Sequence, residues 1–359
     1  MTSYSNALAP LGLLYGAAAR LRRGLYHAGV FRVHQIDEPV ISVGNLTTGG
    51  TGKTPLVEWI AREVASKGRR VCILTRGYGR KAPHQRVIVS DGKSILADEN
   101  AAGDEPLLLA EKLLGLAAVI SDANRVSAAA WARENLAPDV FILDDGFQYL
   151  KLARELNILC IDATNPWGGE RLLPAGRLRE PLAEVKRADC IVITRADQAT
   201  GIELLESRMA QLARGRPILR SSVKTIGLRP LHLNKNDGNA DRSTMPRGPL
   251  AAFCGIGNPQ SFFTQLDREG QTLSYSRAFP DHHWYQQADV DKVVAEARRR
   301  GAVAMVTTEK DAVKLRSLRF EIPCYVVRIE IKVDDEGRLR ELINAALLSE
   351  PRHVGVAGG

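Results

Sequence analysis

Cysteine is scarce in this 359-residue sequence, with five residues at positions 72, 160, 190, 254 and 324. No two of them have the Cys-x-x-Cys spacing of a metal site, and each lies in an apolar run typical of a strand. Scattered cysteines in apolar surroundings are usually buried, reduced thiols. We therefore expect neither a disulfide framework nor a zinc centre, and a protein that faces the cytosol fits.

Long apolar runs are lacking as well. Residues 1–19 carry no charged side chain, but polar residues, Pro10, Gly12 and Gly16 interrupt them. The stretch is too short and too weakly apolar to span a bilayer as a helix. No basic segment precedes it and no small-residue cleavage site follows it, so no secretory signal is predicted.

The composition shows no extreme. Hydrophobic residues make up 45% of the chain and charged residues 25%, which excludes a largely disordered or fibrous protein. The length is sufficient for two domains. Lys and Arg number 49 against 41 Asp and Glu, and the resulting charge of +8 favours an anionic partner. A phosphorylated substrate, a nucleic acid or an acidic membrane would each fit.

Residues 8–31 have the pattern of an amphipathic helix. Its apolar positions recur at steps of three and four and are Leu11, Leu14, Ala18, Leu21 and Leu25. Arg20, Arg22, Arg23 and His27 follow, with aromatic residues near the ends. This pattern is typical of a helix that lies in a membrane surface, and equally of a helix packed on its own domain. The segment alone leaves both interpretations open.

From Val40 onward, short apolar runs alternate with helical patterns. The runs are rich in Val and Ile and nearly continuous, which is typical of strands buried on both faces of a parallel sheet. They cover residues 40–43, 71–74, 87–89, 140–143, 158–161 and 190–193. The predicted fold class is therefore α/β, with a doubly wound parallel sheet.

A polar stretch over residues 234–248 predicts a linker. Apolar runs at 250–254, 303–307 and 324–327 follow it, so we expect a second, smaller α/β unit. The predicted organisation is an N-terminal helix over 1–31, a core domain over 32–233, a smaller domain over 234–349 and a frayed tail over 350–359.

A glycine-rich loop follows the run at 40–43 and leads to a helix predicted from about Pro55. Strand, loop and helix in this order favour a phosphate-binding loop, because backbone N–H groups can surround phosphate oxygens at the positive end of a helix. The expected phosphate-binding residues are Thr48, Gly49, Gly50, Thr51, Gly52, Lys53 and Thr54. Lys53 would reach the β- and γ-phosphates, and the Thr54 hydroxyl would bind Mg²⁺. Thr47 stands where the strict motif has glycine, so the loop is a variant; a purely structural loop is the alternative.

The run at 140–143 ends in two carboxylates, Asp144 and Asp145. In P-loop enzymes a strand delivers an aspartate to Mg²⁺ beside the phosphate loop in this way. An apolar run ending in Asp is also common at turns. With a phosphate loop upstream we expect a metal role, and the sequence does not tell which carboxylate holds the metal.

Two segments that follow predicted strands, Ile193–Asp197 and Thr307–Asp311, could approach a nucleotide base. The first loosely resembles the Asn-Lys-x-Asp base reader of P-loop GTPases, with Thr-Arg in place of Asn-Lys. Both could equally be ordinary strand-to-helix turns.

Asp104 and Glu105 open a predicted helix, as acidic residues often do. The segment Phe279–Trp284 is less ordinary, because it places two adjacent histidines beside a carboxylate and aromatic rings in a loop. Such histidines suit proton handling or metal ligation. If His282 lies beside Asp104 in the fold, the two could take a proton from an alcohol.

Together these motifs resemble those of the tetraacyldisaccharide 4′-kinase family of lipid A synthesis, over most of the chain. They are the N-terminal Leu-Tyr-Gly…Leu-Arg segment and residues 44–55, 76–80, 103–106, 144–148, 173–181, 279–283 and 308–311. No single motif is specific to the family, but the number of motifs and their order along the chain are. The family's own phosphate loop is a variant, so Thr47 agrees with the resemblance.

The resemblance implies a kinase that uses ATP and Mg²⁺ to phosphorylate the 4′-hydroxyl of an acylated glucosamine disaccharide 1-phosphate, which gives lipid IVA. It implies a P-loop core domain, a smaller α/β domain with the site between them, and a place on the cytoplasmic face of the bacterial inner membrane. By position, Lys53 and Thr54 would take the phosphate and Mg²⁺ roles, and Asp144 and Asp145 the metal-binding role.

The resemblance also implies that Asp104 is the catalytic base, with His282 as its partner, and that Glu180 lies near the nucleotide. Four arginines, Arg76, Arg80, Arg177 and Arg179, could hold phosphates of the acceptor or the nucleotide, or be solvated surface charges.

We expect a monomer. A nucleic-acid partner is not expected, because the arginines are scattered and no nucleic-acid module is recognisable. The alternative function is a membrane-associated P-loop NTPase that switches between states and phosphorylates no lipid.

Overall fold

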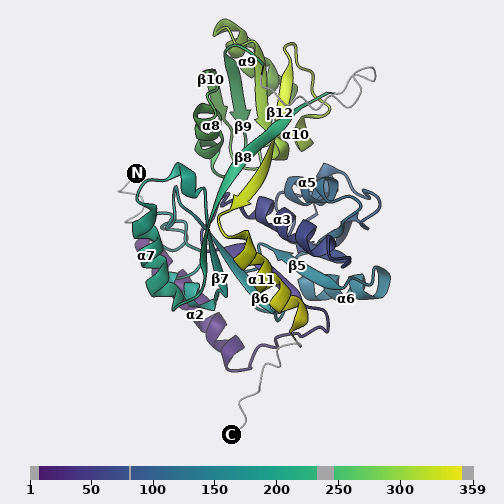
Figure 1. The fold of residues 1–359 in the computed structure, drawn as a ribbon, viewed down its shortest axis with the longest axis vertical. Coiled ribbons are helices and arrows are strands. Elements are labelled where there is room, and N and C mark those ends of the chain that lie inside the picture. Colours follow the sequence, from purple (N-terminus) through teal and green to yellow (C-terminus); the bar gives the residue numbers. More distant parts are fainter. Residues whose placement is uncertain (1–7, 81, 233–245, 350–359) are drawn as a thin grey trace.

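The protein is described from a computed structural model, over residues 8–80, 82–232 and 246–349. It forms a larger and a smaller lobe (Figure 1). The larger lobe holds strands β1 (Val40–Asn45), β2 (Val71–Thr75), β3 (Val87–Ser90), β4 (Ala117–Ser121), β5 (Val140–Asp144), β6 (Leu156–Asp162) and β7 (Cys190–Thr194). Its helices are α2 (Ala9–His27), α3 (Lys53–Ala65), α4 (Glu99–Ala102), α5 (Asp104–Lys112), α6 (Arg125–Asn135), η1 (Leu182–Arg187), η2 (Ala196–Gln198), α7 (Ile202–Ala213) and α11 (Glu336–Leu348).

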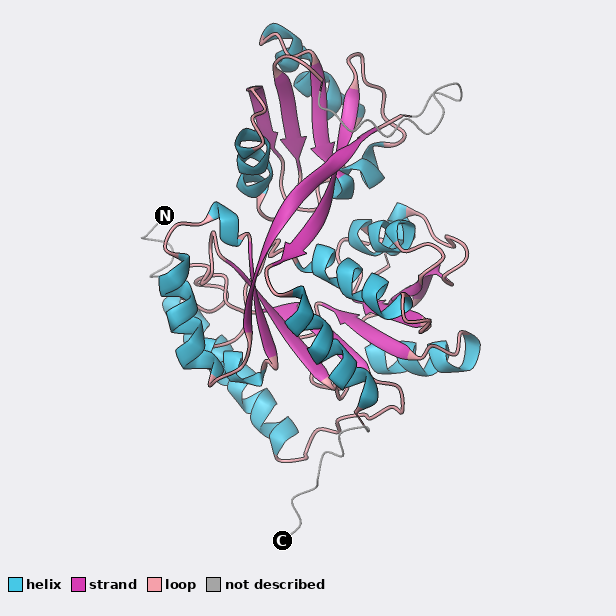
Figure 2. Ribbon diagram, in the orientation of Figure 1, coloured by secondary structure: helices cyan, strands magenta, loops and turns pink. Residues whose placement is uncertain are grey.

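The smaller lobe holds β9 (Leu250–Cys254), β10 (Leu273–Ala278) and β11 (Ala304–Thr308), with α8 (Pro259–Arg268), α9 (Gln287–Arg299) and α10 (Glu309–Leu315). Two long strands, β8 (Ile218–Pro230) and β12 (Cys324–Val333), join the lobes (Figure 2). Strand β8 pairs with β7 over Ile218–Arg220 and then with β12 over Ser221–Pro230. The connection between the lobes is thus a two-stranded antiparallel ribbon.

All strands form one sheet in the order β10-β9-β11-β12-β8-β7-β6-β1-β5-β2-β4-β3. Neighbours from β8 to β4 are parallel, and β1 lies between β6 and β5, so the direction of winding reverses there. Strands β1, β2 and β4 to β7 are buried along their whole length, as their continuous apolar runs predict. The predicted α/β, doubly wound class is confirmed.

The structure differs from the sequence-based expectation at the edge of this sheet. The run at 87–89 forms β3, which is antiparallel to β4. Strand β4 itself, Ala-Ala-Val-Ile-Ser, is not among the predicted strands. Its alanines are small and weak strand formers, and neighbouring strands rather than local propensity stabilise it.

Helices cover both faces of the larger lobe's sheet. Helices α3, α5 and α11 share one apolar cluster with Ile41, Ile73 and Ile142, whereas α6 packs on the opposite face with Leu74 and Phe141. Helix α11 falls within the range expected for the smaller domain, 234–349. It packs nonetheless in the same cluster as the phosphate-loop helix α3, so the chain returns to the larger lobe after β12.

Helix α2 contacts the larger lobe through small residues. Gly12 and Gly16 are its buried residues, and a Cβ at either would meet atoms of residues 172–175 within about 3.3 Å. Its predicted apolar face is largely exposed, with 50% of Leu11, 67% of Leu14 and 66% of Leu21 accessible. No helix within the described ranges is both long enough and apolar enough to span a membrane.

All five cysteines are buried and unpaired, which confirms the expected reduced thiols. Most of the predicted linker at 234–248 and the whole predicted tail at 350–359 lie outside the described residues.

Candidate active site

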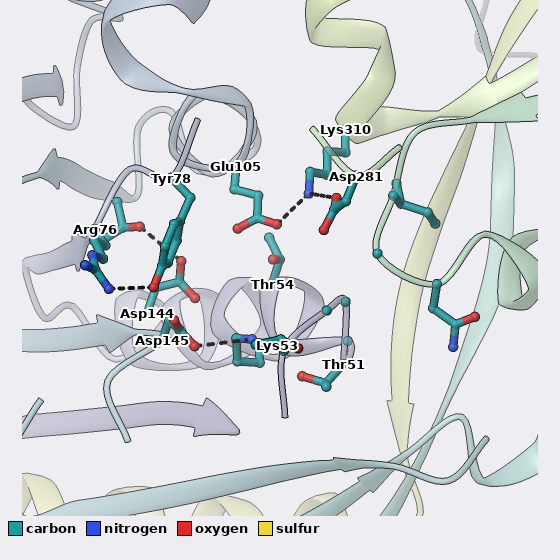
Figure 3. A pocket seen from close by; sticks show the side chains of 18 of the residues that line it. Thr51, Lys53, Thr54, Arg76, Tyr78, Glu105, Asp144, Asp145, Asp281 and Lys310 are labelled. Carbon is teal, nitrogen blue, oxygen red and sulfur yellow. Dashed lines mark hydrogen bonds and ion pairs between the residues drawn. The ribbon is translucent and has the colours of Figure 1, made fainter. Parts of the chain in front are cut away.

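A cavity of about 920 Å³ lies between the lobes, at the carboxyl ends of the parallel strands. Open α/β sheets bind ligands at this edge, near the point where the winding reverses. The larger lobe contributes the phosphate loop and the ends of β2, β5 and β7. The smaller lobe contributes the loops after β9 and β10 and the start of α10. Figure 3 shows side chains from both lobes pointing into this space.

The phosphate loop connects β1 to α3, as the sequence predicts. Gly49 and Gly52 have φ angles of 106° and 74°, which glycine adopts without strain. Thr47 has no positive φ and instead forms an isolated bridge with Leu178, so the variant position needs no glycine. The Lys53 ammonium lies 3.1 Å from Asn45 Oδ1 and borders the cavity.

The two carboxylates at the end of β5 have different surroundings. Asp145 lies 3.3 Å from Lys53 Nζ and 2.7 Å from Arg179 Nη1. These two cations outweigh burial and hold the pKa of Asp145 well below its usual range. Asp144 accepts a hydrogen bond from the Thr75 hydroxyl and forms no ion pair within the described residues. Burial, with the charges of Glu105 and Asp145, raises its pKa to about 7.

Asp144 and Thr54 together fit a magnesium ion. The carboxylate of Asp144 is 3% exposed and forms no ion pair within the described residues, so a metal charge would stabilise its ionised form. Both residues border the cavity. The described residues contain no group of three or more His, Cys, Asp or Glu that could hold a metal unaided. A site of one or two protein oxygens agrees with Mg²⁺, which keeps waters and binds substrate phosphates.

Asp104 and His282, 178 residues apart in sequence, are in contact. Asp104 opens α5 and is 4% exposed, and His282 Nδ1 lies 2.9 Å from its Oδ1 and 3.1 Å from its Oδ2. His282 also borders the cavity. The pairing that the sequence left conditional is therefore present.

Lysines of α10 complete this cluster. Lys314 Nζ lies 2.9 Å from Asp104 Oδ2, and Lys310 Nζ lies 2.8 Å from Glu105 Oε1 and 3.1 Å from Asp281 Oδ1. Although burial opposes it, the His282 hydrogen bond and the two lysine charges hold the pKa of Asp104 well below its usual range. For His282, the bond to Asp104 outweighs burial and raises the pKa.

Glu180, which the resemblance places near the nucleotide, borders the same cavity. It forms an ion pair with Arg187 and accepts a hydrogen bond from Gln148 Nε2 at 3.3 Å. Gln148 also donates to the Asn45 carbonyl at the end of β1, so this carboxylate is tied to the phosphate-loop strand.

In both candidate base-recognition segments, the aspartate does not border the cavity, whereas other residues in or next to the segment do. Asp197 does not border it, whereas Gln198 does. Arg195 supports the phosphate loop by donating to the Gly50 carbonyl at 2.9 Å. Asp311 is fully buried and accepts hydrogen bonds from Gly255 N and the Tyr285 hydroxyl, so its role is structural.

The four arginines separate into different environments. Arg76 and Arg179 border the cavity, and Arg177 lies against Gly49 in an adjoining pocket. The expectation is wrong for Arg80, which is neither a phosphate ligand nor solvated. Arg80 is 5% exposed and donates to the carbonyls of Ser121 and Pro83. These hydrogen bonds hold the chain after β2 against the end of β4.

The sequence analysis missed Arg125 at the start of α6. Arg125 is 5% exposed, borders the cavity, stacks on Tyr149 and pairs with no carboxylate within the described residues. A buried guanidinium without an ion-pair partner suits an anionic ligand. The signal available was its place four residues after the end of β4, a strand that was itself not predicted.

Comparison with known proteins identifies the family of this chain. The family model described as tetraacyldisaccharide-1-P 4′-kinase matches residues 4–348. The tetraacyldisaccharide 4′-kinase of Geobacter metallireducens is 42% identical over 343 residues, 95% of this chain and 97% of that protein. That of Chlorobaculum parvum is 40% identical over 313 residues, 86% and 84% of the two chains.

Among solved structures, the crystal structure of an "apo" form of LpxK from Aquifex aeolicus in complex with ATP matches with a TM-score of 0.74. The sequence identity is 32%, and the match covers 96% of this chain and 99% of that one. Family model, relatives and structure agree over nearly the whole length. The chain belongs to the tetraacyldisaccharide-1-P 4′-kinase family.

Proposed function

We propose that this protein is an ATP-dependent lipid kinase of lipid A synthesis. It transfers the γ-phosphoryl group of ATP to the 4′-hydroxyl of a tetraacylated glucosamine disaccharide 1-phosphate. The observation that carries the proposal is the cavity itself, which is bordered by a phosphate loop and by His282, the partner of the buried Asp104. Phosphoryl transfer needs positioning, charge neutralisation and a group that accepts the alcohol proton, and these residues supply all three.

On the nucleotide side, the backbone of residues 48–54 surrounds the phosphates, and Lys53 offsets the charge of the transferred group. Asp144 and Thr54 would hold Mg²⁺, which when bound would neutralise charge on the phosphate oxygens. Asp145, already paired with Lys53 and Arg179, keeps the lysine in place and is not the direct ligand. Glu180 and Gln148 lie at the edge of this region.

On the acceptor side, the Asp104–His282 pair takes the proton of the attacking hydroxyl. Asp104 orients His282 through Nδ1, and the two act as a unit because they share one hydrogen bond. Arg125 and Arg76 offer positive charge to the phosphate that the acceptor carries. A phosphorylated, acylated sugar is thereby favoured over a neutral one.

The product assay tests the function directly. The purified chain is incubated with ATP, Mg²⁺ and the disaccharide 1-phosphate lipid, and the lipid is weighed by mass spectrometry. The expected lipid gains one phosphate. A matched acceptor whose 4′-hydroxyl is already phosphorylated should gain none. Phosphate released to water, with the lipid unchanged, would instead favour the NTPase alternative.

The protein is also proposed to act as a monomer docked on the cytoplasmic face of the inner membrane through α2. Tyr15, Ala18 and Arg22 of α2 border the same cavity, while its leucines are exposed to the surroundings. A lipid acceptor could therefore keep its acyl chains in the bilayer beside the helix while its sugar enters the site. The arginines of α2 would add attraction to an anionic leaflet.

A pair of variants tests this docking. Leu14→Glu with Leu21→Glu places charge on side chains that are already exposed, so folding should be preserved. Co-sedimentation with anionic phospholipid vesicles is expected to fall strongly. Leu204→Glu on α7, a leucine that is 78% exposed, is the matched control and should bind normally. Equal binding of all three proteins would remove α2 from the membrane contact.

A further inference from the structure

The aspartate of the segment Thr307–Asp311 is structural and does not border the cavity. The helix that this segment leads into, α10, nevertheless carries the most deeply buried ammonium group described at the site. Only 1% of the Lys314 side chain is accessible, and it does not border the cavity. A lysine is almost never buried to this extent unless a carboxylate accompanies it. The contacts of Lys314 are therefore informative.

One carboxylate accounts for this burial. Lys314 Nζ lies 2.9 Å from Asp104 Oδ2, and the Asp104 side chain is 4% exposed. The ring of Tyr285 lies 5.9 Å from the same ammonium, and the Tyr285 hydroxyl is occupied by Asp311. Within the described residues, Lys314 therefore donates its hydrogen bond to Asp104.

The contact crosses the cleft. Asp104 belongs to α5 of the larger lobe, whereas Lys314 and His282 both come from the smaller lobe. His282 Nδ1 lies within 3.1 Å of both oxygens and Lys314 Nζ lies 2.9 Å from Oδ2, so both oxygens of the carboxylate are contacted from the opposite lobe. Two contacts of this kind fix the plane of a carboxylate in a way that one cannot.

We infer that Lys314 is a positioning residue of the phosphoryl-transfer reaction: its buried ammonium keeps the Asp104 carboxylate ionised and oriented toward His282. This inference rests on the proposed function. Lys314 acts through Asp104 and touches no substrate, because it lies behind the cavity wall. It thereby makes the proton-accepting pair depend on contact between the lobes.

The charges around Asp104 determine the expected effect. The titratable groups that face this region are Glu105 from α5, Asp281 and His282 from the loop after β10, and Lys310, Asp311 and Lys314 from α10. Lys310 is already occupied by Glu105 and Asp281. Removing Lys314 therefore takes away the cation that is hydrogen-bonded to Asp104, and protonation of both Asp104 and His282 becomes more favourable.

The test is the pH dependence of lipid phosphorylation by the full chain. Lys314→Met is expected to lower kcat at neutral pH by roughly 10- to 100-fold and to move the acidic limb upward by about 1 pH unit or more. The KM for ATP should stay within about twofold of the wild type, because the phosphate loop is untouched. Lys314→Arg, which keeps the charge, should recover most of the rate.

Arg316→Met is the matched control. Arg316 directly follows α10 and pairs with Glu111 of α5, so it joins the same two helices without touching Asp104. Its pH profile should match the wild type. A Lys314→Met profile that also matches the wild type would overturn the inference, whereas a wild-type protein that phosphorylates no lipid would overturn the proposed function instead.

A double-variant cycle keeps the test decisive if Lys314→Met alone fails to fold. Asp104→Asn combined with Lys314→Met removes both charges of this buried pair together. If Lys314 acts only through Asp104, the double variant should retain the same residual kcat as Asp104→Asn alone. A further loss in the double variant would show that Lys314 has a separate role and would overturn the inference.

Discussion

The two sides of the cavity are assembled differently. The nucleotide side consists of the phosphate loop after β1 and the Asp144–Asp145 pair at the end of β5, and these strands are direct neighbours in the larger lobe. The proton-accepting side combines Asp104 of the larger lobe with His282 and Lys314 of the smaller one. The first side is fixed by local chain and strand pairing, whereas the second exists only where the lobes meet.

The two buried carboxylates, one on each side, make the contrast quantitative. Asp144 and Asp104 are 3% and 4% exposed, so burial alone would raise the pKa of both. Burial, with the added negative charge of Glu105 and Asp145, raises the pKa of Asp144 to about 7. That of Asp104 falls because His282, Lys310 and Lys314 surround it. Neighbouring charge therefore distinguishes a buried carboxylate whose ionised form would gain from a metal cation from one that stays ionised beside His282.

The largest expected effect is that of Asp104→Ala. Loss of the proton-accepting pair should lower kcat by about 10²–10⁴-fold while ATP binding changes little. Steady-state kinetics with an independent measurement of ATP affinity separates the two. Asp289→Asn is the control, since Asp289 pairs with His283 in a similar way outside the cavity and should leave kcat unchanged. Equal losses in rate and ATP affinity would break the distinction between the sides.

Lys53→Met tests the nucleotide side. Removal of the ammonium that faces the phosphates should lower kcat/KM for ATP by roughly 10²–10³-fold. Lys67→Met, near the other end of α3 and paired with Glu63, should behave as the wild type. The pH profile of the residual activity is expected to keep its shape, because Asp104 and His282 are untouched. Near-normal use of ATP would contradict the assigned phosphate loop.

His282→Ala should have a smaller effect on rate, about tenfold or more, and should change the pH profile. His282 has a raised pKa, so protonation during folding is favoured. Its contribution to the free energy of unfolding is therefore fully present below pH 6.5, the ordinary histidine value, and is lost as pH rises through the raised pKa. Urea unfolding at pH 5.5 and pH 8 checks the sign of this pH dependence, with His283→Ala as the control variant.

This contrast also explains what the sequence could reveal. The phosphate loop and the Asp144–Asp145 pair are contiguous motifs, so strand, loop and charge are visible together. From the sequence alone, the pairing of Asp104 with His282 is only a conditional prediction, and Lys314 is not singled out. These residues are 178 and 210 positions apart from Asp104, and only tertiary folding joins them. The i, i+4 spacing of Lys310 and Lys314 was the one available signal.

The unpredicted strand β4 is a second limit on what the sequence could reveal about the site. Arg80 is charged and lies beside a glycine-rich segment, so a phosphate contact was a reasonable expectation. Its burial depends on β4, whose alanine-rich sequence gives little indication of a strand. Arg125 was missed for the same reason, because it follows that strand. The errors at Arg80 and Arg125 thus derive from one unpredicted element.

The smallest expected effect belongs to Arg316→Met, and it sharpens the comparison most. Its ion pair with Glu111 joins α10 to α5 like that of Lys314, but the two side chains are 46% and 29% exposed. A pair in contact with water contributes less than about 1 kcal/mol to stability. Urea unfolding should therefore show a small loss, and lipid phosphorylation should be unchanged. A loss of kcat as large as that in Lys314→Met would mean that the charges act by holding the lobes together, and not by setting the state of Asp104.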